Sequence, residues 1–220
     1  EGYIGSVTNA LVIQQETDGN RCVEADGIGS YSSKSDEFIQ DMFTRGLNSR
    51  PTITGLTCIF SPSEGTHDPG AGLRLREGLW PTIKGAVVFG GYVEEVSAGD
   101  HWSLRVDDTV ASDGFALGNA AISDSVFAAV TKSSKTIAGQ DVSDWLQANS
   151  NTVFADLTAP VNPTQAANTD LILFSSSNGF YSVPAGDVVV NDASLPAQAV
   201  AREILGAIAE TNDWTAGWTF

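Results

Sequence analysis

Short runs of β-branched and aromatic residues, separated by turns that contain glycine, recur along this chain of 220 residues. The run at 83–96 is the most strand-like, and residues 101–106 are expected to pair with it after a turn. Two further runs, 10–14 and 21–25, lie on either side of an Asp18-Gly19 pair, which predicts a hairpin. The chain is therefore expected to contain several short strands joined by tight turns.

Segments with helical spacing lie between these runs. Ser35 begins the clearest helix signal, because Asp36 and Glu37 follow it and apolar residues then recur every three or four positions. A second capped helix is expected at 141–148, and residues 196–209 have the most regular apolar face. The remaining expectations are a short helix at 73–80 and strands at 52–60, 170–174 and 215–220.

The order of these elements favours one fold class. The predicted strands come in hairpins, the helices do not alternate strictly with them, and we find no internal repeat. We therefore expect an α+β fold, a β-sandwich of mainly antiparallel sheets flanked by helices, in a single domain spanning residues 1–220. The hydrophobic content of 42% is sufficient to fill its core.

The charge balance excludes some partners. The chain has 27 acidic and 11 basic side chains, a net charge of −16. Such a surface repels nucleic-acid phosphates and anionic lipid, so we expect neither nucleic acid nor a membrane as a partner. Two interpretations of the acidity stay open, a halophilic source and an ordinary acidic surface.

The cysteine content indicates the compartment. Cys22 and Cys58 lie in strand-like runs, outside any zinc-binding pattern, and are expected to be buried free thiols. Apolar stretches fall far short of the roughly 18 residues that a membrane span needs. No signal-peptide pattern opens the chain, so a cytoplasmic protein is expected.

Acidic or amide side chains stand beside glycine or at the expected strand ends in three segments: Asp26-Gly27, Asn178-Gly179 and Asn212-Asp213. Carboxylate, amide and carbonyl oxygens are the ligands that Mg²⁺ or Mn²⁺ takes, and rigid strand ends hold such ligands in place. Each pair, taken alone, is also typical of a simple turn. No nucleotide-binding loop or hydrolase signature accompanies them.

In order, these segments resemble the type-2C metal-dependent protein phosphatases. Residues 25–30, Ala-Asp-Gly-Ile-Gly-Ser, are similar to that family's early Ala-Asp-Gly-x-Gly motif. Residues 105–109 stand where the family has a middle turn. Residues 170–179 resemble its Ser-Asp-Gly segment with Asn178 in place of the aspartate, and residues 212–215 resemble its closing motif with two residues exchanged.

The resemblance implies a fold of α-β-β-α layers and a hydrolase that removes phosphate from phosphoserine or phosphothreonine. In this family Mg²⁺ or Mn²⁺ ions supply the attacking hydroxide. The metal ligands it implies here are Asp26, Gly27, Asn178 and Asp213. Further candidates are Asn9, Asp107, Asp108 and Asn212.

Departures from the family pattern weaken the expected activity. No carboxylate lies near Asn9, Asn178 is neutral, and residues 1–9 lack the arginine that usually holds phosphate. The sequence therefore predicts a pseudophosphatase, a regulatory or binding module for a phosphoprotein or regulatory partner, monomeric or dimeric. An active phosphatase stays open, as does a β-rich structural or coat protein of a halophilic system without enzymatic activity.

Overall fold

The computed structural model describes residues 2–13, 21–60, 71–90, 102–128, 135–154, 173–175 and 180–182. The helices within these ranges are α1 (Asp36–Thr44), α2 (Thr109–Ala116), α3 (Val142–Ala148) and a single 3-10 turn, Tyr31–Ser33. The strands are β1 (Ser6–Ile13), β2 (Arg21–Asp26), β3 (Thr52–Phe60), β4 (Ala71–Arg76), β5 (Thr82–Lys84), β6 (Val87–Gly90), β7 (Trp102–Val106), β8 (Ala121–Ser123), β9 (Val126–Ala128), β10 (Thr152–Phe154), β11 (Leu173–Ser175) and β12 (Phe180–Ser182).

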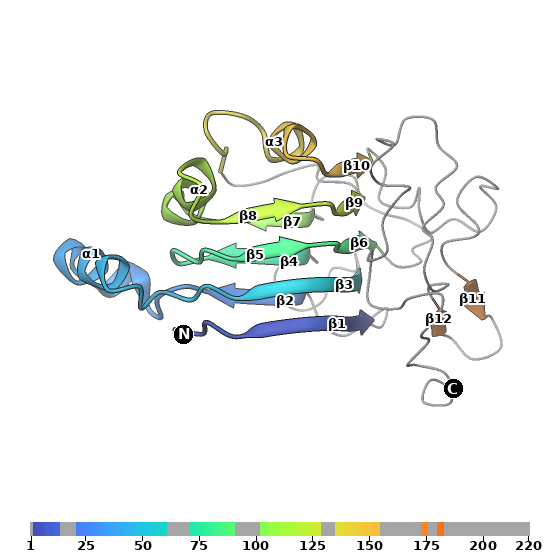
Figure 1. Ribbon diagram of the computed structural model, residues 1–220, viewed down its shortest axis with the longest axis horizontal. Helices are drawn as coiled ribbons and strands as arrows, with labels where there is room; N and C mark the ends of the chain where they lie inside the picture. Colours follow the sequence, from blue (N-terminus) through green and yellow to red (C-terminus); the bar gives the residue numbers. More distant parts are fainter. Residues whose placement is uncertain are drawn as a thin grey trace.

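The chain alternates between two parallel sheets. The first sheet has the order β10-β9-β6-β3-β5-β8, with β1 also pairing β3, and the second has the order β2-β4-β7. Every pair in both sheets is parallel. In Figure 1 the strands of the first sheet follow one another upwards from β1 at the bottom to β10 at the top. The strands β2, β4 and β7 of the second sheet lie beside them.

This alternation makes the chain a flattened coil, the architecture of a parallel β-helix. Within residues 6–128 each circuit adds one strand to the second sheet and either one long strand (β1, β3) or two short ones (β5 and β6, β8 and β9) to the first, so neighbouring strands come from successive circuits. The mixed helix and strand content agrees with the sequence. The expected antiparallel sandwich is not matched in the two larger sheets, and among the described residues antiparallel strand pairing occurs between β11 and β12.

Several local predictions are confirmed. Ser35 is the N-cap of α1, and its side chain accepts a hydrogen bond from the N–H of Phe38 at 3.3 Å. The strand at 52–60 has the predicted bounds, and Asp141 is the N-cap of α3. The predicted helix at 196–209 and strand at 215–220 lie outside the described residues.

Three predictions about local structure are wrong. The strands β1 and β2 form, but they belong to different sheets and make no hairpin. The run at 83–96 is interrupted after β5, and its expected partner β7 lies in the other sheet. Residues 73–76 of the expected 73–80 helix belong to strand β4, because their alternation of leucine and arginine has the two-residue period of a strand. Turn signals indicate where the chain reverses, but not which strand it then pairs with.

A column of left-handed residues bends the first sheet. Thr54 pairs with Thr8 and Lys84, and Lys84 pairs with Ser123. The residues that follow these positions, one on each strand, therefore lie side by side across the sheet. Their φ angles are +55° for Asn9, +66° for Gly55, +65° for Gly85 and +57° for Asp124, and Ser150 continues the column at +62°. Glycine, asparagine and aspartate adopt this conformation most readily, which explains why such residues recur here.

The core fills the space between the two sheets. Its largest fully buried side chains include Phe60, Leu73, Leu104 and Phe127. An added Cβ at Gly72 would lie 2.3 Å from Cγ1 of Val88, so a glycine is required where β4 packs against β6 across the core. No helix of the described residues has the length and apolar character to cross a membrane.

A disulfide joins Cys22 of β2 to Cys58 of β3. The expectation of free thiols is therefore wrong. The reason is topological: consecutive strands of the coil lie in opposite sheets, and this brings two cysteines 36 residues apart into contact through the core.

We expect Leu73→Ala to lower the free energy of unfolding by about 3 kcal/mol, because it leaves a cavity in the core. Leu117, which is 74% exposed, supplies the matched control, and Leu117→Ala should change stability by less than about 0.5 kcal/mol. Urea denaturation measures both. Equal losses would contradict the assignment of Leu73 to the core.

Reduction of the disulfide should lower the free energy of unfolding by about 4 kcal/mol, since the bond closes a long loop in the unfolded chain. Denaturation with and without reductant measures the loss, and the double variant Cys22→Ser/Cys58→Ser should be insensitive to reductant. Alkylation of both cysteines in denatured, unreduced protein would show that the bond is absent.

Candidate functional site

The fold brings part of the predicted metal site together. Asp26 ends β2, Gly27 follows it, and Asp107 and Asp108 follow β7. Because β2, β4 and β7 are parallel, their carboxyl ends meet at one end of the second sheet. Asn9 is instead an exposed residue in the bend of the first sheet. The other three candidates, Asn178, Asn212 and Asp213, lie outside the described residues.

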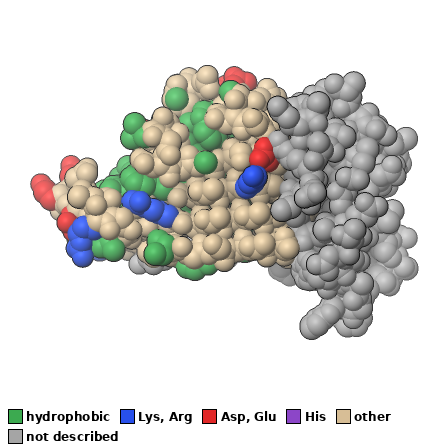
Figure 2. Space-filling model, viewed as in Figure 1, with side chains coloured by type: hydrophobic (Ala, Val, Ile, Leu, Met, Phe, Trp, Pro, Cys, Tyr) green, Lys and Arg blue, Asp and Glu red, His purple; other side chains and the backbone are tan. Residues whose placement is uncertain are grey.

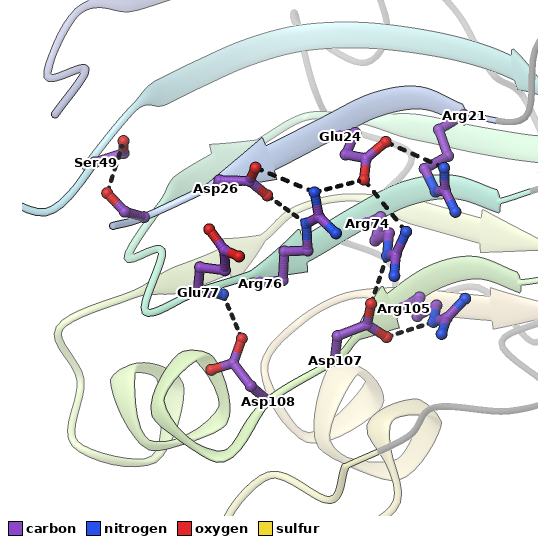
Figure 3. Close-up of polar contacts among 11 residues, drawn as sticks. Arg21, Glu24, Asp26, Ser49, Arg74, Arg76, Glu77, Arg105, Asp107 and Asp108 are labelled. Carbon is purple, nitrogen blue, oxygen red and sulfur yellow. Dashed lines mark hydrogen bonds and ion pairs between the residues drawn. The ribbon is translucent and has the colours of Figure 1, made fainter. Parts of the chain in front are cut away.

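The second sheet carries a set of ion pairs that we call the charged ladder (Figure 3). Its members are Arg21, Glu24, Asp26, Arg74, Arg76, Arg105 and Asp107. One row is in register across all three strands, Glu24 beside Arg74 and Arg74 beside Arg105, and Asp26 is in register with Arg76. Side chains two residues apart on a strand share one face, so these charges gather on the same surface.

Asp26 forms a two-point contact with Arg76. Nε of Arg76 lies 2.5 Å from Oδ1 of Asp26, and Nη2 lies 3.2 Å from Oδ2. The same guanidinium contacts Glu24 at 3.1 Å. The hydrogen bond that Arg76 donates to Asp26 is the main cause that raises the pKa of Arg76. Arg76 is therefore held in its charged form between two carboxylates of the neighbouring strand.

The next contacts continue the ladder towards β7. Glu24 also accepts Nη1 of Arg74 at 3.2 Å, and Arg74 in turn donates Nε to Asp107. Asp107 receives a second Nε from Arg105, whose guanidinium lies 4.6 Å from the ring centroid of Trp102. The side chains of Arg74 and Asp107 are each only 12% exposed. These charges are largely removed from water, which makes their pairing more important than that of surface ions.

The neighbouring candidates also have structural partners. The carbonyl oxygen of Gly27 accepts the N–H of Ser49 at 3.0 Å and its hydroxyl at 3.2 Å. Asp108 caps α2 by accepting the N–H of Ala111 at 2.8 Å, and it also accepts the N–H of Glu77. An added Cβ at Gly27 would lie 2.3 Å from the backbone of Gly78, so close packing explains this glycine.

These contacts do not fit a divalent cation. Both oxygens of Asp26 face a guanidinium, and a metal there would have to displace that cation. In the described ranges no three histidine, cysteine or acidic side chains form a group that could hold a metal ion. Asp26, Gly27, Asp107 and Asp108 thus lie at the same end of the second sheet, and each of them binds other groups of the protein.

Two other side chains, Tyr31 and Glu37, have shifted pKa values. Burial raises the pKa of Tyr31, with smaller contributions from the charges of Asp108, Asp36 and Asp113. At the start of α1, hydrogen bonds from its own backbone and from Ser35 lower the pKa of Glu37. Both shifts follow from local burial and helix capping, which gives no indication of an acid–base pair.

The arginines of the ladder were not recognised from the sequence. Their signal was an alternation of apolar and charged residues that occurs in three strands, as Val23-Glu24-Ala25-Asp26, Leu73-Arg74-Leu75-Arg76 and Leu104-Arg105-Val106-Asp107. Aligning these three segments would have predicted the rows of charge.

Comparisons with known proteins leave the family open, since no protein-family model, curated protein or solved structure matches the chain.

Asp107→Asn should lower the free energy of unfolding by about 2 kcal/mol, because it leaves Arg74 and Arg105 without their shared carboxylate. The control Asp41→Asn breaks an exposed pair with Arg45, in which both side chains are more than half exposed, and should cost less than about 0.5 kcal/mol. Urea denaturation compares the two. A loss no larger than that of the control would mean that the ladder contributes little to stability.

Proposed function

We propose that this chain is a structural module, a stack of coils that serves as a rigid spacer or coat element without enzymatic activity. The observation that carries this proposal is the use of Asp26 and Asp107, two candidates for catalytic metal binding, as links between successive coils. Carboxylates that neutralise arginines on neighbouring strands stabilise the stack, and they are poorly placed to hold catalytic ions.

The architecture supports such a role. In a solenoid each coil contacts mainly its neighbours, so the molecule is extended along one axis and its length follows from the number of coils. Backbone hydrogen bonds and the charged ladder connect one coil to the next, and the disulfide joins the two sheets through the core. A module of this kind is suited to span a distance or to form part of a surface layer.

The disulfide supports an oxidising compartment, because structural disulfides persist mainly outside the cytosol. This part of the proposal replaces the cytoplasmic location expected from the sequence. A halophilic source stays a prediction. The half-buried pairs of the ladder are screened less by salt than surface charges are, and such pairs would keep their strength in brine.

The type-2C phosphatase hypothesis, with its α-β-β-α layers, its Mg²⁺ or Mn²⁺ ions and a phosphoprotein partner, also stays a prediction. The contacts of Asp26 and Gly27 give it no support. The two hypotheses differ in what Asp26 does, and this difference can be measured.

For the structural role, Asp26→Ala should lower the free energy of unfolding by about 1 kcal/mol, with or without metal, because it removes the two-point contact with Arg76. Thermal unfolding in chelator and in Mn²⁺ measures this, with Asp41→Ala as a control for loss of a surface carboxylate. Mn²⁺ should not stabilise the wild-type protein, and phosphopeptides should not be hydrolysed.

The phosphatase hypothesis gives the opposite result. A metal that binds the folded protein raises its melting temperature. Stabilisation of the wild type by Mn²⁺ that is lost in Asp26→Ala, together with Mn²⁺-dependent turnover of a phosphopeptide, would overturn the structural proposal.

A further inference from the structure

The strand β1 lies at the edge of the first sheet and, in the described part of the chain, pairs with β3 alone. Residues 6–9 are exposed to solvent. The N–H of Thr52 donates to the carbonyl oxygen of Gly5 at 3.0 Å. By the alternation of a strand, the N–H and C=O groups of Ser6 and Thr8 then point away from β3. This row of backbone groups is a template for another strand.

Within β1 itself, the charged residues and prolines that usually protect an exposed edge are missing. Its sequence, Ser-Val-Thr-Asn-Ala-Leu-Val-Ile, contains no charged residue and no proline. Lysines, prolines and bulges usually prevent edge strands from pairing with other chains. The left-handed Asn9 is no such bulge, because Gly55 beside it in β3 has the same conformation and the register is kept. In a chain with a net charge of −16, β1 offers eight uncharged residues in a row.

Apolar side chains are exposed at the same end of the coil. Ile4 is 71%, Tyr3 49% and Val7 38% exposed. The N–H of Arg50 donates to the carbonyl oxygen of Tyr3 at 2.8 Å, which fixes this segment beside the start of β3. Figure 2 shows hydrophobic and uncharged atoms over β1 along the lower edge of the described surface. End coils of solenoids need a polar outer face to stay soluble, and the described residues 2–13 of this end offer uncharged polar and apolar side chains without a single charge.

We propose that the free edge of β1 pairs antiparallel with β1 of a second copy of this chain. A strand that pairs with this edge should carry no charge, because a charged strand would have to bury its charges against Tyr3, Ile4 and Val7. A second β1 meets this requirement. A two-fold axis perpendicular to the sheets brings the two β1 strands together and the two β2 strands towards each other, so the pairing closes as a dimer.

The uncharged edge is also where two copies can approach at least electrostatic cost. Each carries a net charge of −16, so association is opposed at low salt and favoured when salt screens the repulsion. The dimer deepens the proposed structural role by naming a partner, and it is tested separately. A monomer that shows the expected Asp26→Ala result would overturn the pairing and leave the structural role intact.

The test is sedimentation velocity from about 1 to about 100 µM protein, in about 0.1 M and about 1 M salt. The wild type should form a dimer, more strongly at high salt. Ser6→Lys/Thr8→Lys should raise the dissociation constant at least about tenfold, because like charges then oppose each other across the two-fold axis. The matched control is Thr52→Lys/Thr82→Lys, in the same row as Ser6 but within the sheet. It changes the net charge equally and should leave the constant within about twofold of the wild type.

A second variant checks the backbone directly. Thr8→Pro removes an N–H that points to the free edge, so it should abolish the dimer and keep the fold, measured by circular dichroism. A wild type that is monomeric at every concentration and salt would overturn the proposal. So would open filaments, or a dimer that Ser6→Lys/Thr8→Lys and Thr8→Pro leave unchanged.

Discussion

The rest of the structure depends on the in-register parallel pairing of successive coils. In this arrangement each residue lies directly beside its equivalents in the coils before and after it. A side chain must therefore be compatible with the side chains that occupy the same register position in the neighbouring coils. The left-handed bend of the first sheet, from Asn9 to Ser150, is one column of such positions, and the apolar core is another.

The same constraint explains the charged ladder. A column of identical charges would repel, so a parallel sheet with charges on one face must mix the two signs across its strands. Arg74 stands between Glu24 and Arg105, and the carboxylate of Asp107 compensates the two adjacent arginines. Four of the seven arginines of this acidic chain lie in the ladder. Arginines are thus concentrated where partly buried carboxylates need a partner.

The sequence predicted local structure better than topology. The cap at Ser35 and the strand at 52–60 depend on neighbouring residues, and both were predicted correctly. The parallel pairing of β2 with β4 joins residues 50 positions apart, and no turn signal between them indicates it. A repeat did exist: an apolar residue two positions before the left-handed one occurs at Val7, Ile53, Ile83 and Ile122. Its spacing varies because loops and helices of different lengths are inserted between coils, which hides the period.

The predicted site shows the same limit. Asp26-Gly27 at the end of a strand has the local sequence of a metal ligand, of a turn and of an ion-pair partner alike, because a carboxylate beside a glycine suits all three. What distinguishes them is the group opposite the carboxylate, and here that group is Arg76, 50 residues away in the sequence. The chemistry of Asp26 is thus decided by the coil that follows it. A short sequence motif, considered without the strands beside it, therefore predicts where a charged residue lies more reliably than what that residue does.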